Sequence, residues 1–466
     1  MAATAWPAPW VTICSVAITS SSADRMFSGF SRYARCSTQY ASTRTTEVGS
    51  QDSGPSVRRK RPSLWRSDRE GRLNLPFGLS RPPTLPRVIK YLGSKRALAP
   101  ALGALASASG SRTALDLFTG STRVAQEFKR RGIHTTAADI ATYSAVLAQC
   151  FIATDARTVD RTRLAEVLDH LNTLPGRPGY VTATFCEQAR YFQPHNGARI
   201  DAIRDELAQH FVADPLLPIL LTSLLLAADR VDSTAGMQQA YLKSWSRRSY
   251  NALELREPEL LSGTGESVLG DAREVVEAMD PVDLAYLDPP YNQHRYFTNY
   301  HIWETLIRWD SPEHYGIACK RIDARDPASK SIFNRKREMP SAFTDLLRRT
   351  KAQALVVSYN DEAWISPEQM LTALHETGHD DVTVMEFDHE RYVGARIGIY
   401  SPRGVKVGQV TRVRNVEYLY VAGLTDDQLA QARREYASGR SSVDTRRTGG
   451  ALSTRGVETG GPATRP

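Results

Sequence analysis

The sequence shows no clear membrane span, secretory signal or cysteine metal-binding motif. The longest apolar run, 216–228, is too short for a membrane span and is more typical of a buried helix, so we expect no membrane contact. No basic residue precedes the apolar patch near residues 10–18, which argues against a secretory signal and for a cytoplasmic location. No Cys-x-x-Cys pair occurs, which indicates a reducing compartment and no metal site; the five cysteines are Cys14, Cys36, Cys150, Cys186 and Cys319.

A surplus of positive charge is also missing from most of the chain. The formal charge is +8, but residues 1–87 hold 13 Lys and Arg against 5 Asp and Glu, and the remainder is neutral. A contact with nucleic acid in the folded part must therefore come from a local patch.

The two ends of the chain differ in composition from its middle. Residues 1–86 are rich in Ser, Thr, Arg and Pro and have little periodicity, which predicts a disordered basic extension. An early start codon would explain this extension, and a nucleic-acid-binding arm is the alternative. Residues 425–466 begin with a short helical piece at 426–439 and continue as a predicted disordered tail.

The middle of the chain alternates strands with helices, as expected for an α/β fold with a mostly parallel sheet. Residues 87–149 and 263–424 are interpreted as two parts of one core. The helix-rich stretch 150–262 interrupts them and is interpreted as an inserted helical domain. The expected strands are Thr113–Phe118, Ile133–Ala138, Ser267–Gly270, Val282–Leu287, Ala354–Tyr359, Val382–Phe387, Arg396–Tyr400 and Val416–Val421.

The stretch AYLDPPYNQH (Ala285–His294) places an acid directly after a predicted buried strand. Pro289 and Pro290 must end this strand, because neither can donate a ladder hydrogen bond. Asp288 therefore lies at a strand's carboxyl end, where open α/β sheets bind their ligands.

Two further turns are typical of a nucleoside site. The strand that ends at Phe118 is followed by Gly120, and the next strand ends at Asp139, an acid that could hold ribose hydroxyls. A packing glycine and a helix N-cap are the simpler alternatives for these two residues. Neither GxGxxG nor GxxxxGK[ST] is present, so we expect a nucleoside ligand without a polyphosphate.

Taken together, residues 88–424 resemble the Dam-like, α-class DNA adenine methyltransferases that use S-adenosylmethionine. One departure is Thr122, which stands where the family's glycine turn usually has its second glycine; if Thr122 crowds the cofactor, binding would be weak. The motifs that carry the resemblance are KYLGSK (Lys90–Lys95), DLFTGSTRVAQ (Asp116–Gln126), ADI (Ala138–Ile140), GDA (Gly270–Ala272), LDPPYNQHRYFTNYH (Leu287–His301), SYNDE (Ser358–Glu362) and RYVGARIGIY (Arg391–Tyr400).

The resemblance implies a Rossmann-like methyltransferase sheet with one antiparallel strand, and 150–262 as the target-recognition domain. It also implies the site. The catalytic residues would be Asp288, Pro289, Pro290 and Tyr291, with Tyr291 stacking on the target base. S-adenosylmethionine would be bound by Tyr91, Lys95, Asp116, Phe118, Gly120, Asp139 and Asp271, with Lys95 pairing with the methionine carboxylate.

Double-stranded DNA is the implied partner of a bacterial or phage enzyme that we expect to be monomeric, with a cognate restriction endonuclease as a further partner. The segment 232–250 mixes basic and aromatic residues, which suits phosphates and stacking. A solvated helix face is the alternative for any one of them. The predicted DNA-binding residues are Lys243, Arg247, Arg248, His294 and Tyr296.

Other reactions remain open at the level of sequence. Amino methylation of cytosine uses the same chemistry, although that group more often has serine at the position of Asp288. Methylation of RNA or of a protein amide, and a catalytically inactive DNA-binding module, are further alternatives. Methylation of the cytosine ring carbon is disfavoured, because it needs a nucleophilic cysteine, commonly in Pro-Cys, and no Pro-Cys occurs.

Overall fold

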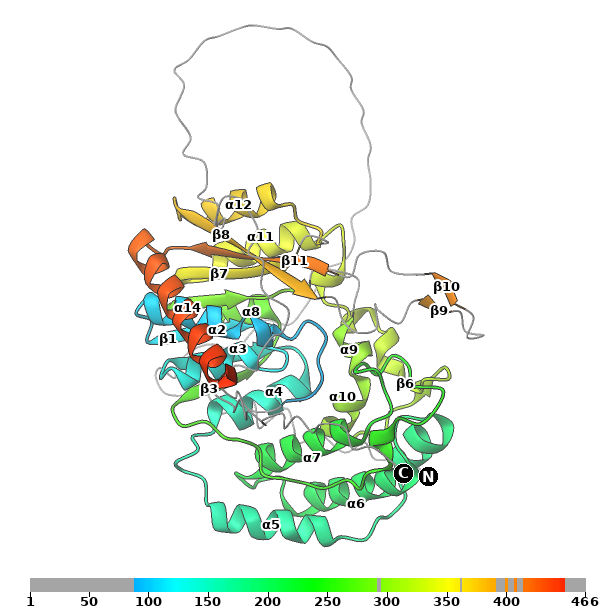
Figure 1. Ribbon diagram of the computed structural model, residues 1–466. Helices are drawn as coiled ribbons and strands as arrows, with labels where there is room; N and C mark the ends of the chain where they lie inside the picture. Colours follow the sequence, from blue (N-terminus) through cyan, green and yellow to red (C-terminus); the bar gives the residue numbers. More distant parts are fainter. Residues whose placement is uncertain are drawn as a thin grey trace, which may run out of the picture. The chain divides into compact units, whose positions relative to one another are not determined.

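The computed structural model describes residues 88–290, 295–360, 363–390, 399–400, 406–408 and 414–448. Within this part of the chain, seven strands form one mixed sheet in the order β3-β2-β1-β4-β7-β11-β8 (Figure 1). The expected α/β fold is confirmed. The strands are β1 (Thr113–Leu117), β2 (His134–Asp139), β3 (Gly265–Leu269), β4 (Val282–Leu287), β7 (Ala352–Asn360), β8 (Val382–Glu390) and β11 (Arg414–Ala422).

The sheet is mostly parallel. Neighbouring strands from β3 to β7 pair in parallel, whereas β11 pairs antiparallel with both β7 and β8. The strand predicted at Arg396–Tyr400 is wrong as a member of this sheet. Its described part, β9 (Ile399–Tyr400), pairs instead with β10 (Lys406–Gly408), because a nearby segment of the chain satisfies its backbone groups.

The chain changes direction across the sheet between β1 and β4. After β1 it builds β2 and β3 on one side, and it then returns to place β4 on the other side of β1. The connection that follows β1 therefore leads to β2 on one side, and the connection that follows β4 leads to β7 on the other side. Such a switch point opens a crevice outside the carboxyl ends of the two strands, where open α/β sheets bind ligands.

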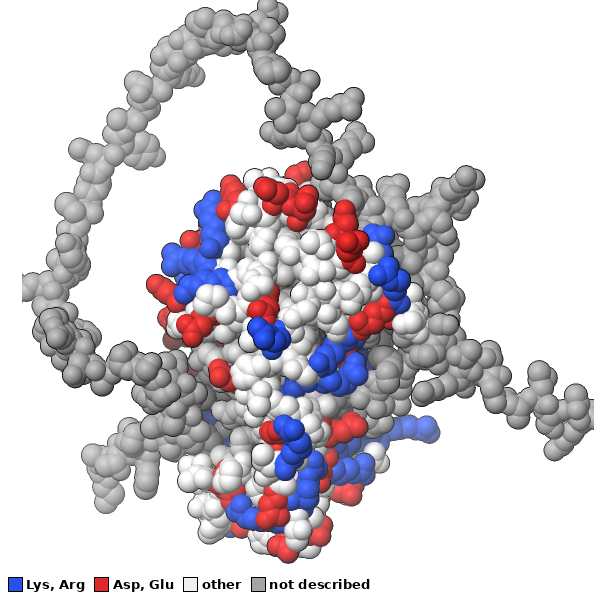
Figure 2. Space-filling view, turned by 90° about the vertical axis from the view of Figure 1, so that its left-hand side faces the viewer, with Lys and Arg blue, Asp and Glu red and all other residues white. Residues whose placement is uncertain are grey.

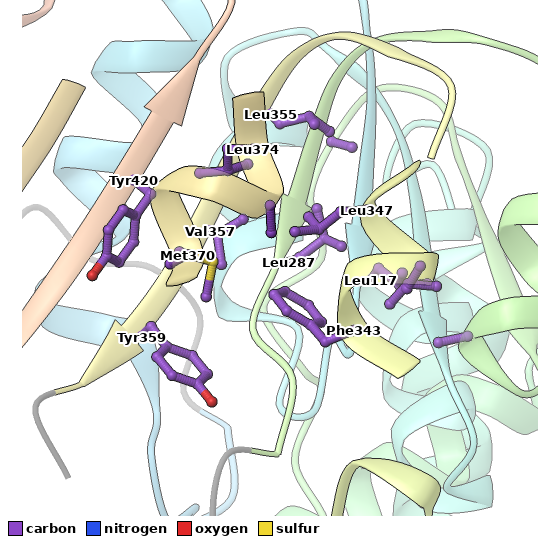
Figure 3. Close-up of a cluster of buried hydrophobic side chains, with 14 of the residues drawn as sticks. Leu117, Leu287, Phe343, Leu347, Leu355, Val357, Tyr359, Met370, Leu374 and Tyr420 are labelled. Atoms are coloured by element: carbon purple, nitrogen blue, oxygen red, sulfur yellow. The ribbon is translucent and has the colours of Figure 1, made fainter. Parts of the chain in front are cut away.

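Successive residues of each strand point to opposite faces of the sheet, and each face buries its own apolar cluster. Figure 3 shows the first cluster, in which Leu117, Leu287 and Val357 pack against side chains such as Phe343 and Leu374. The helices over this face are α8 (Ala272–Ala278), α11 (Met339–Arg349) and α12 (Pro367–His375).

The opposite face is covered by α2 (Ala99–Ala108), α3 (Arg123–Arg130) and α14 (Asp426–Thr448). The last of these helices is longer than the 14-residue piece predicted at its start. Leu429 and Ala432 of α14 are buried in the cluster on this face, which fixes the helix against the sheet. This apolar contact could not be predicted from the polar composition of the segment, and residues 449–466 of the expected tail lie outside the described part of the chain.

The stretch 150–262 holds helices and loops and no strand residue. In α7 (Leu217–Val231) the apolar run is almost wholly buried, as its composition predicts. Among the described residues, no helix combines the length and apolar character needed to cross a membrane. The helices here are α5 (Arg161–Thr173), α6 (Pro194–His210), α7 (Leu217–Val231), the π-helices η2 (Gln149–Ala153) and η3 (Thr182–Gln188), and the 3₁₀ turn η4 (Arg247–Tyr250).

Further elements complete the core. The turn η1 (Lys95–Ala97) precedes α2, and α4 (Thr142–Ala148) follows β2. Between β4 and β7 lie α9 (Tyr296–Asn299), α10 (His301–Arg308) and the small pair β5 (His314–Tyr315) and β6 (Lys320–Arg321).

Candidate active site

The crevice at the switch point brings two sequence motifs together. Leu117, the last residue of β1, lies in register with Leu287, the last residue of β4. The turn that follows β1 and the Asp288-Pro289-Pro290 segment that follows β4 are therefore neighbours, although about 170 residues separate them in the sequence. Pro289 is buried at this edge. Tyr291 and His294 lie outside the described residues.

The turn after β1 has an unusual backbone. Phe118, Gly120 and Thr122 all have positive φ angles, of 70°, 51° and 60°. Gly120 adopts this conformation without strain, whereas the other two side chains carry a steric cost. Thr122 is buried and turned into the protein, where its Oγ1 accepts a hydrogen bond from Gln126 Nε2 at 2.8 Å.

Asp139 fastens this turn to the end of β2. Its Oδ2 accepts a hydrogen bond from Gly120 N at 2.8 Å, and its Oδ1 accepts one from Ala141 N at 2.9 Å. Burial raises the pKa of Asp139 above its usual value, and these hydrogen bonds oppose the shift. The N-cap position of α4 is held by Ala141, so Asp139 is a brace between two turns rather than the helix cap that the sequence allowed.

Asp116 lies inside the same turn. Its Oδ2 accepts hydrogen bonds from Thr119 Oγ1 at 2.7 Å and from Ala125 N at 2.9 Å. Its Oδ1 is buried without a hydrogen-bond partner among the described residues. Burial raises the pKa of Asp116 to about 7. A buried acceptor of this kind is costly to leave unsatisfied, and a cationic donor would bind it well.

Three tyrosine rings stack beside the glycine. The ring of Tyr91 lies against Gly120, where an added Cβ atom would meet Tyr91 Cε1 at 2.8 Å. Tyr91 stacks on Tyr300 with centroids 4.7 Å apart and on Tyr296 with centroids 5.4 Å apart. Tyr300 is buried, and its hydroxyl accepts a hydrogen bond from Leu92 N at 2.5 Å. Tyr296, predicted to contact DNA, thus belongs to the wall of this site.

Asp288 is part of an ion-pair network. Lys95 Nζ lies 3.0 Å from Asp288 Oδ1 and 2.8 Å from Glu417 Oε1. The three side chains are 7%, 18% and 6% exposed, so this network is largely shielded from water. Burial raises the pKa of Asp288, the Lys95 ammonium lowers it, and the Glu417 carboxylate raises it. Lys95, predicted to bind the cofactor's carboxylate, has protein carboxylates as partners in this structure.

Asp271 lies at the N-terminus of α8, at the carboxyl end of β3. Its side chain accepts a hydrogen bond from Arg273 N at 3.0 Å and forms an ion pair with Arg273 Nε at 2.9 Å. These contacts are those of a helix N-cap, which stabilises α8 whether or not Asp271 also reaches a ligand.

The predicted DNA-binding segment 232–250 is partly exposed and partly tied to the protein. Lys243 and Arg247 are exposed. Arg248 instead contacts the protein: its Nη2 atom lies 2.5 Å from Asp232 Oδ1 and donates a hydrogen bond to Thr234 O at 2.7 Å. Because the Arg248 guanidinium is already paired with the buried Asp232 carboxylate, Arg248 is a poor candidate for phosphate binding.

The face that Figure 2 shows carries basic and acidic side chains side by side. No wide area of one sign stands out among the described residues on this face. This agrees with the neutral balance of the folded part and leaves any DNA contact to local groups.

Glu417 is a described residue of the site that was not predicted from the sequence. A signal was present: in β11, Glu417 alternates in phase with Leu419 and Val421, which are buried on the face covered by α2, α3 and α14. An acid at an inward position of a strand needs a cation or a donor nearby. The partner, Lys95, lies more than 300 residues away in the sequence and could not be identified without the fold.

Comparison with known proteins identifies the family of this chain. A family model described as D12 class N6 adenine-specific DNA methyltransferase matches residues 91–372, more than half of the chain. Modification methylase StsI of Streptococcus sanguinis is 28% identical over 324 residues, which are 65% of this chain and 49% of the relative, so the chain spans about half the length of that relative.

Two shorter relatives are covered almost completely. Type II methyltransferase M.NlaIII of Neisseria lactamica is 28% identical over 64% of this chain and 91% of the relative. Type II methyltransferase M.CviAII of Paramecium bursaria Chlorella virus 1 is 29% identical over 59% of this chain and 83% of the relative. The matched residues 91–372 include the glycine turn, Asp139 and Asp288. The chain belongs to the D12 class of N6 adenine-specific DNA methyltransferases.

Proposed function

We propose that this protein transfers the methyl group of S-adenosylmethionine to the exocyclic amino group of adenine in a short double-stranded DNA site. One observation carries the proposal. Asp288 is held by an ion pair at the carboxyl end of β4, directly beside the glycine turn that follows β1. A target base at Asp288 and a cofactor at the turn would lie next to each other at the switch point of the sheet.

The residues around the turn suit this cofactor. The buried Oδ1 atom of Asp116 is an acceptor without a donor among the described residues, and the ammonium of a methionine moiety would satisfy it. Gly120 and the Tyr91 ring form one wall. Phe118 lies in the same turn, with its ring packed edge-on against Phe333 at a centroid distance of 5.1 Å, and is proposed as a further cofactor contact. Asp139 would accept from the ribose hydroxyls with its remaining lone pairs, and Asp271 is proposed for the adenine edge. When bound, S-adenosylmethionine supplies a methyl group activated by its sulfonium.

Asp288 and Pro289 would act on the target amino group. The lone pair of that nitrogen is delocalised into the adenine ring, which makes it a poor nucleophile. The Asp288 carboxylate and the Pro289 carbonyl can each accept a hydrogen bond from one of its two protons. Two such acceptors favour a tetrahedral nitrogen whose lone pair is available for attack. Pro289 and Pro290 hold the backbone rigidly, so these acceptors are preorganised and little is lost to reorganisation.

The target base must leave the duplex to reach Asp288. Unstacking costs a few kcal/mol, and an aromatic ring stacked on the base returns part of it. We assign that ring to Tyr291 and site recognition to the helical stretch 150–262. Lys243 and Arg247 are the basic residues of 232–250 that are exposed for phosphate contacts.

The experiment is a reaction with isotopically labelled cofactor and unmethylated double-stranded DNA, followed by mass spectrometry of the nucleosides. Label on N6-methyladenine is the expected result. Label only in cytosine would move the target base while keeping the site, and no label in the DNA would overturn the substrate class. Asp288→Ala, which removes the side-chain acceptor, is the matched blank.

Several relatives are named type II methyltransferases or modification methylases. By that likeness we propose that this enzyme is the modifying half of a restriction-modification pair, and we propose further that it works as a monomer. DNA modified by the enzyme should resist a cognate endonuclease, and a single sedimenting species of about 52 kDa is expected.

A further inference from the structure

The antiparallel strand places a second carboxylate at the reaction edge of the sheet. Because β11 runs opposite to its neighbours, its amino-terminal part lies where the parallel strands have their carboxyl ends. Glu417, four residues into β11, is in register with Asn360, the last residue of β7. This orientation explains how a residue near the end of the folded chain reaches the site.

Three acids of the site share one face of the sheet. Asp288 follows Leu284 and Tyr286 at alternate positions of β4, and Asp116 follows Ala114 in β1. Glu417 precedes Leu419 in the same way, and all three apolar sets belong to the cluster under α2. Lys95 comes from η1, just before α2, and its ammonium reaches two of these three acids.

The network therefore contains two carboxylates for one ammonium. The ion pair to Glu417 is as short as the pair to Asp288, at 2.8 Å against 3.0 Å, and both acids are mostly buried. A single carboxylate would be enough to balance Lys95. The second one gives these three described side chains a net negative charge, which would favour the positive charge that develops on the methylated amino group.

We propose that Glu417 is a positioning residue for methyl transfer: it shares the Lys95 ammonium with Asp288, so that Lys95 holds Asp288 in place without neutralising it as a hydrogen-bond acceptor. This proposal rests on the proposed function. It assigns to the antiparallel strand a role in the reaction, in addition to its role in completing the sheet.

Among the described residues, the titratable groups that interact with Asp288 come from four elements. They are Lys95 from η1, Asp116 from β1, the Tyr286 hydroxyl from β4 and Glu417 from β11. Asp288 must be ionised to accept from the amino group, so its protonation produces the acidic limb of the pH–rate profile. Since a neighbouring carboxylate disfavours ionisation, loss of the charge on Glu417 should move this limb to lower pH.

The test compares Glu417→Gln with the wild-type enzyme from about pH 5 to about pH 9, with labelled S-adenosylmethionine and unmethylated double-stranded DNA. We expect kcat to fall roughly tenfold to a hundredfold and the acidic limb to move down by about one pH unit, with KM for the cofactor little changed. Glu386→Gln is the control, because Glu386 is exposed on the adjacent strand β8; its profile should match the wild type.

An acidic limb that stays in place in a folded Glu417→Gln enzyme would overturn the proposal, even if kcat falls. Glu417→Asp keeps the charge but shortens the side chain by one methylene, so it should lower kcat severalfold and hold the limb near its wild-type position. If Glu417→Gln does not fold, unchanged kcat in Glu417→Asp overturns the proposal. A wild-type enzyme that methylates no DNA would instead count against the proposed function.

Discussion

Lys95 Nζ lies 3.0 Å from Asp288 Oδ1, which joins the motif before the sheet to the motif after β4 in one largely buried ion pair. A buried pair of this kind is sensitive to the loss of either partner, since the remaining charge is then left uncompensated. The protonation state of Asp288 should therefore depend on Lys95.

Lys95→Gln should move the acidic limb of the pH–rate profile to higher pH. The pKa of Asp288 is raised to about 6, chiefly by burial and also by Glu417, and the Lys95 ammonium limits that rise. Without the ammonium, Asp288 and Glu417 are two neighbouring carboxylates, so a proton is released only at higher pH. Steady-state methylation as a function of pH measures this shift, and Lys351→Gln on the exposed surface should leave the limb in place. A shift to lower pH would contradict the ion pair.

Asp288→Ala should abolish methyl transfer but leave affinity for S-adenosylmethionine within about tenfold of the wild type. The physical reason is that Asp288 acts on the target amino group, whereas the cofactor would rest on the turns after β1 and β2. Calorimetric titration and single-turnover kinetics separate the two effects. The exposed Asp280, at the opposite end of β4, supplies the control Asp280→Ala. Near-normal turnover by Asp288→Ala would refute the mechanism.

Asp116→Asn should make the protein without cofactor more stable at alkaline pH. The pKa of Asp116 is raised to about 7 in the folded state from its ordinary value of 3.8, chiefly by burial. An acid whose pKa is raised on folding contributes stability below its unfolded pKa and loses it as pH rises through the folded pKa. The stabilising effect of the substitution should thus grow between about pH 4 and pH 8, by roughly 1–3 kcal/mol.

The same substitution should weaken cofactor binding by roughly 1–3 kcal/mol, because it removes the anionic acceptor that would bind the ammonium. Chemical denaturation at several pH values, combined with calorimetry, measures both effects. Equal stability of the two proteins at each pH would show that Asp116 is hydrated rather than buried.

Gly120→Ala should disrupt the turn more than its backbone conformation alone would require. A Cβ atom at Gly120 would lie 2.8 Å from the Tyr91 ring, and φ is 51°. Gly110→Ala is the matched control: its φ of 72° is also positive, but an added Cβ there meets nothing within 4 Å. Both variants should lose about 1 kcal/mol of stability to backbone strain. Only Gly120→Ala should also bind the cofactor more weakly, which calorimetry would measure. Equal cofactor affinities of the two variants would show that the Tyr91 ring moves aside to make room for the added Cβ atom.

Deletion of residues 1–86 should leave specific methylation intact. This segment holds nearly the whole positive surplus of the chain and has no pattern that could bury a core. Non-specific affinity for DNA should fall, and it should depend less steeply on salt concentration. The reason is that each phosphate contact that is lost also removes the release of counterions from that phosphate. Binding isotherms at several salt concentrations are the measurement. Loss of site choice on truncation would make the extension part of the enzyme.

The sequence by itself determined the strand–turn units of this protein. Val282–Leu287 is apolar and β-favouring, and two prolines end it shortly afterwards. Gly120 and Asp139 lie at the ends of their own strands. Local chemistry was therefore enough to predict the order of these units along the chain and their position at the carboxyl edge of the sheet. The prediction of Val416–Val421 as a strand was confirmed as part of β11 for the same reason. Motif order likewise indicated the family to which the chain belongs.

Only the tertiary structure decided which side chains share the site. The antiparallel direction of β11 depends on pairing with two strands at once, and that direction alone brings Glu417 to Lys95 and Asp288. Arg248 forms an ion pair with the buried Asp232 of its own loop region. Tyr296 stacks on Tyr91, which lies far upstream in the sequence. Each of these contacts joins segments whose approach is set by the packing of the whole sheet and its helices, a long-range effect that no local pattern of residues encodes.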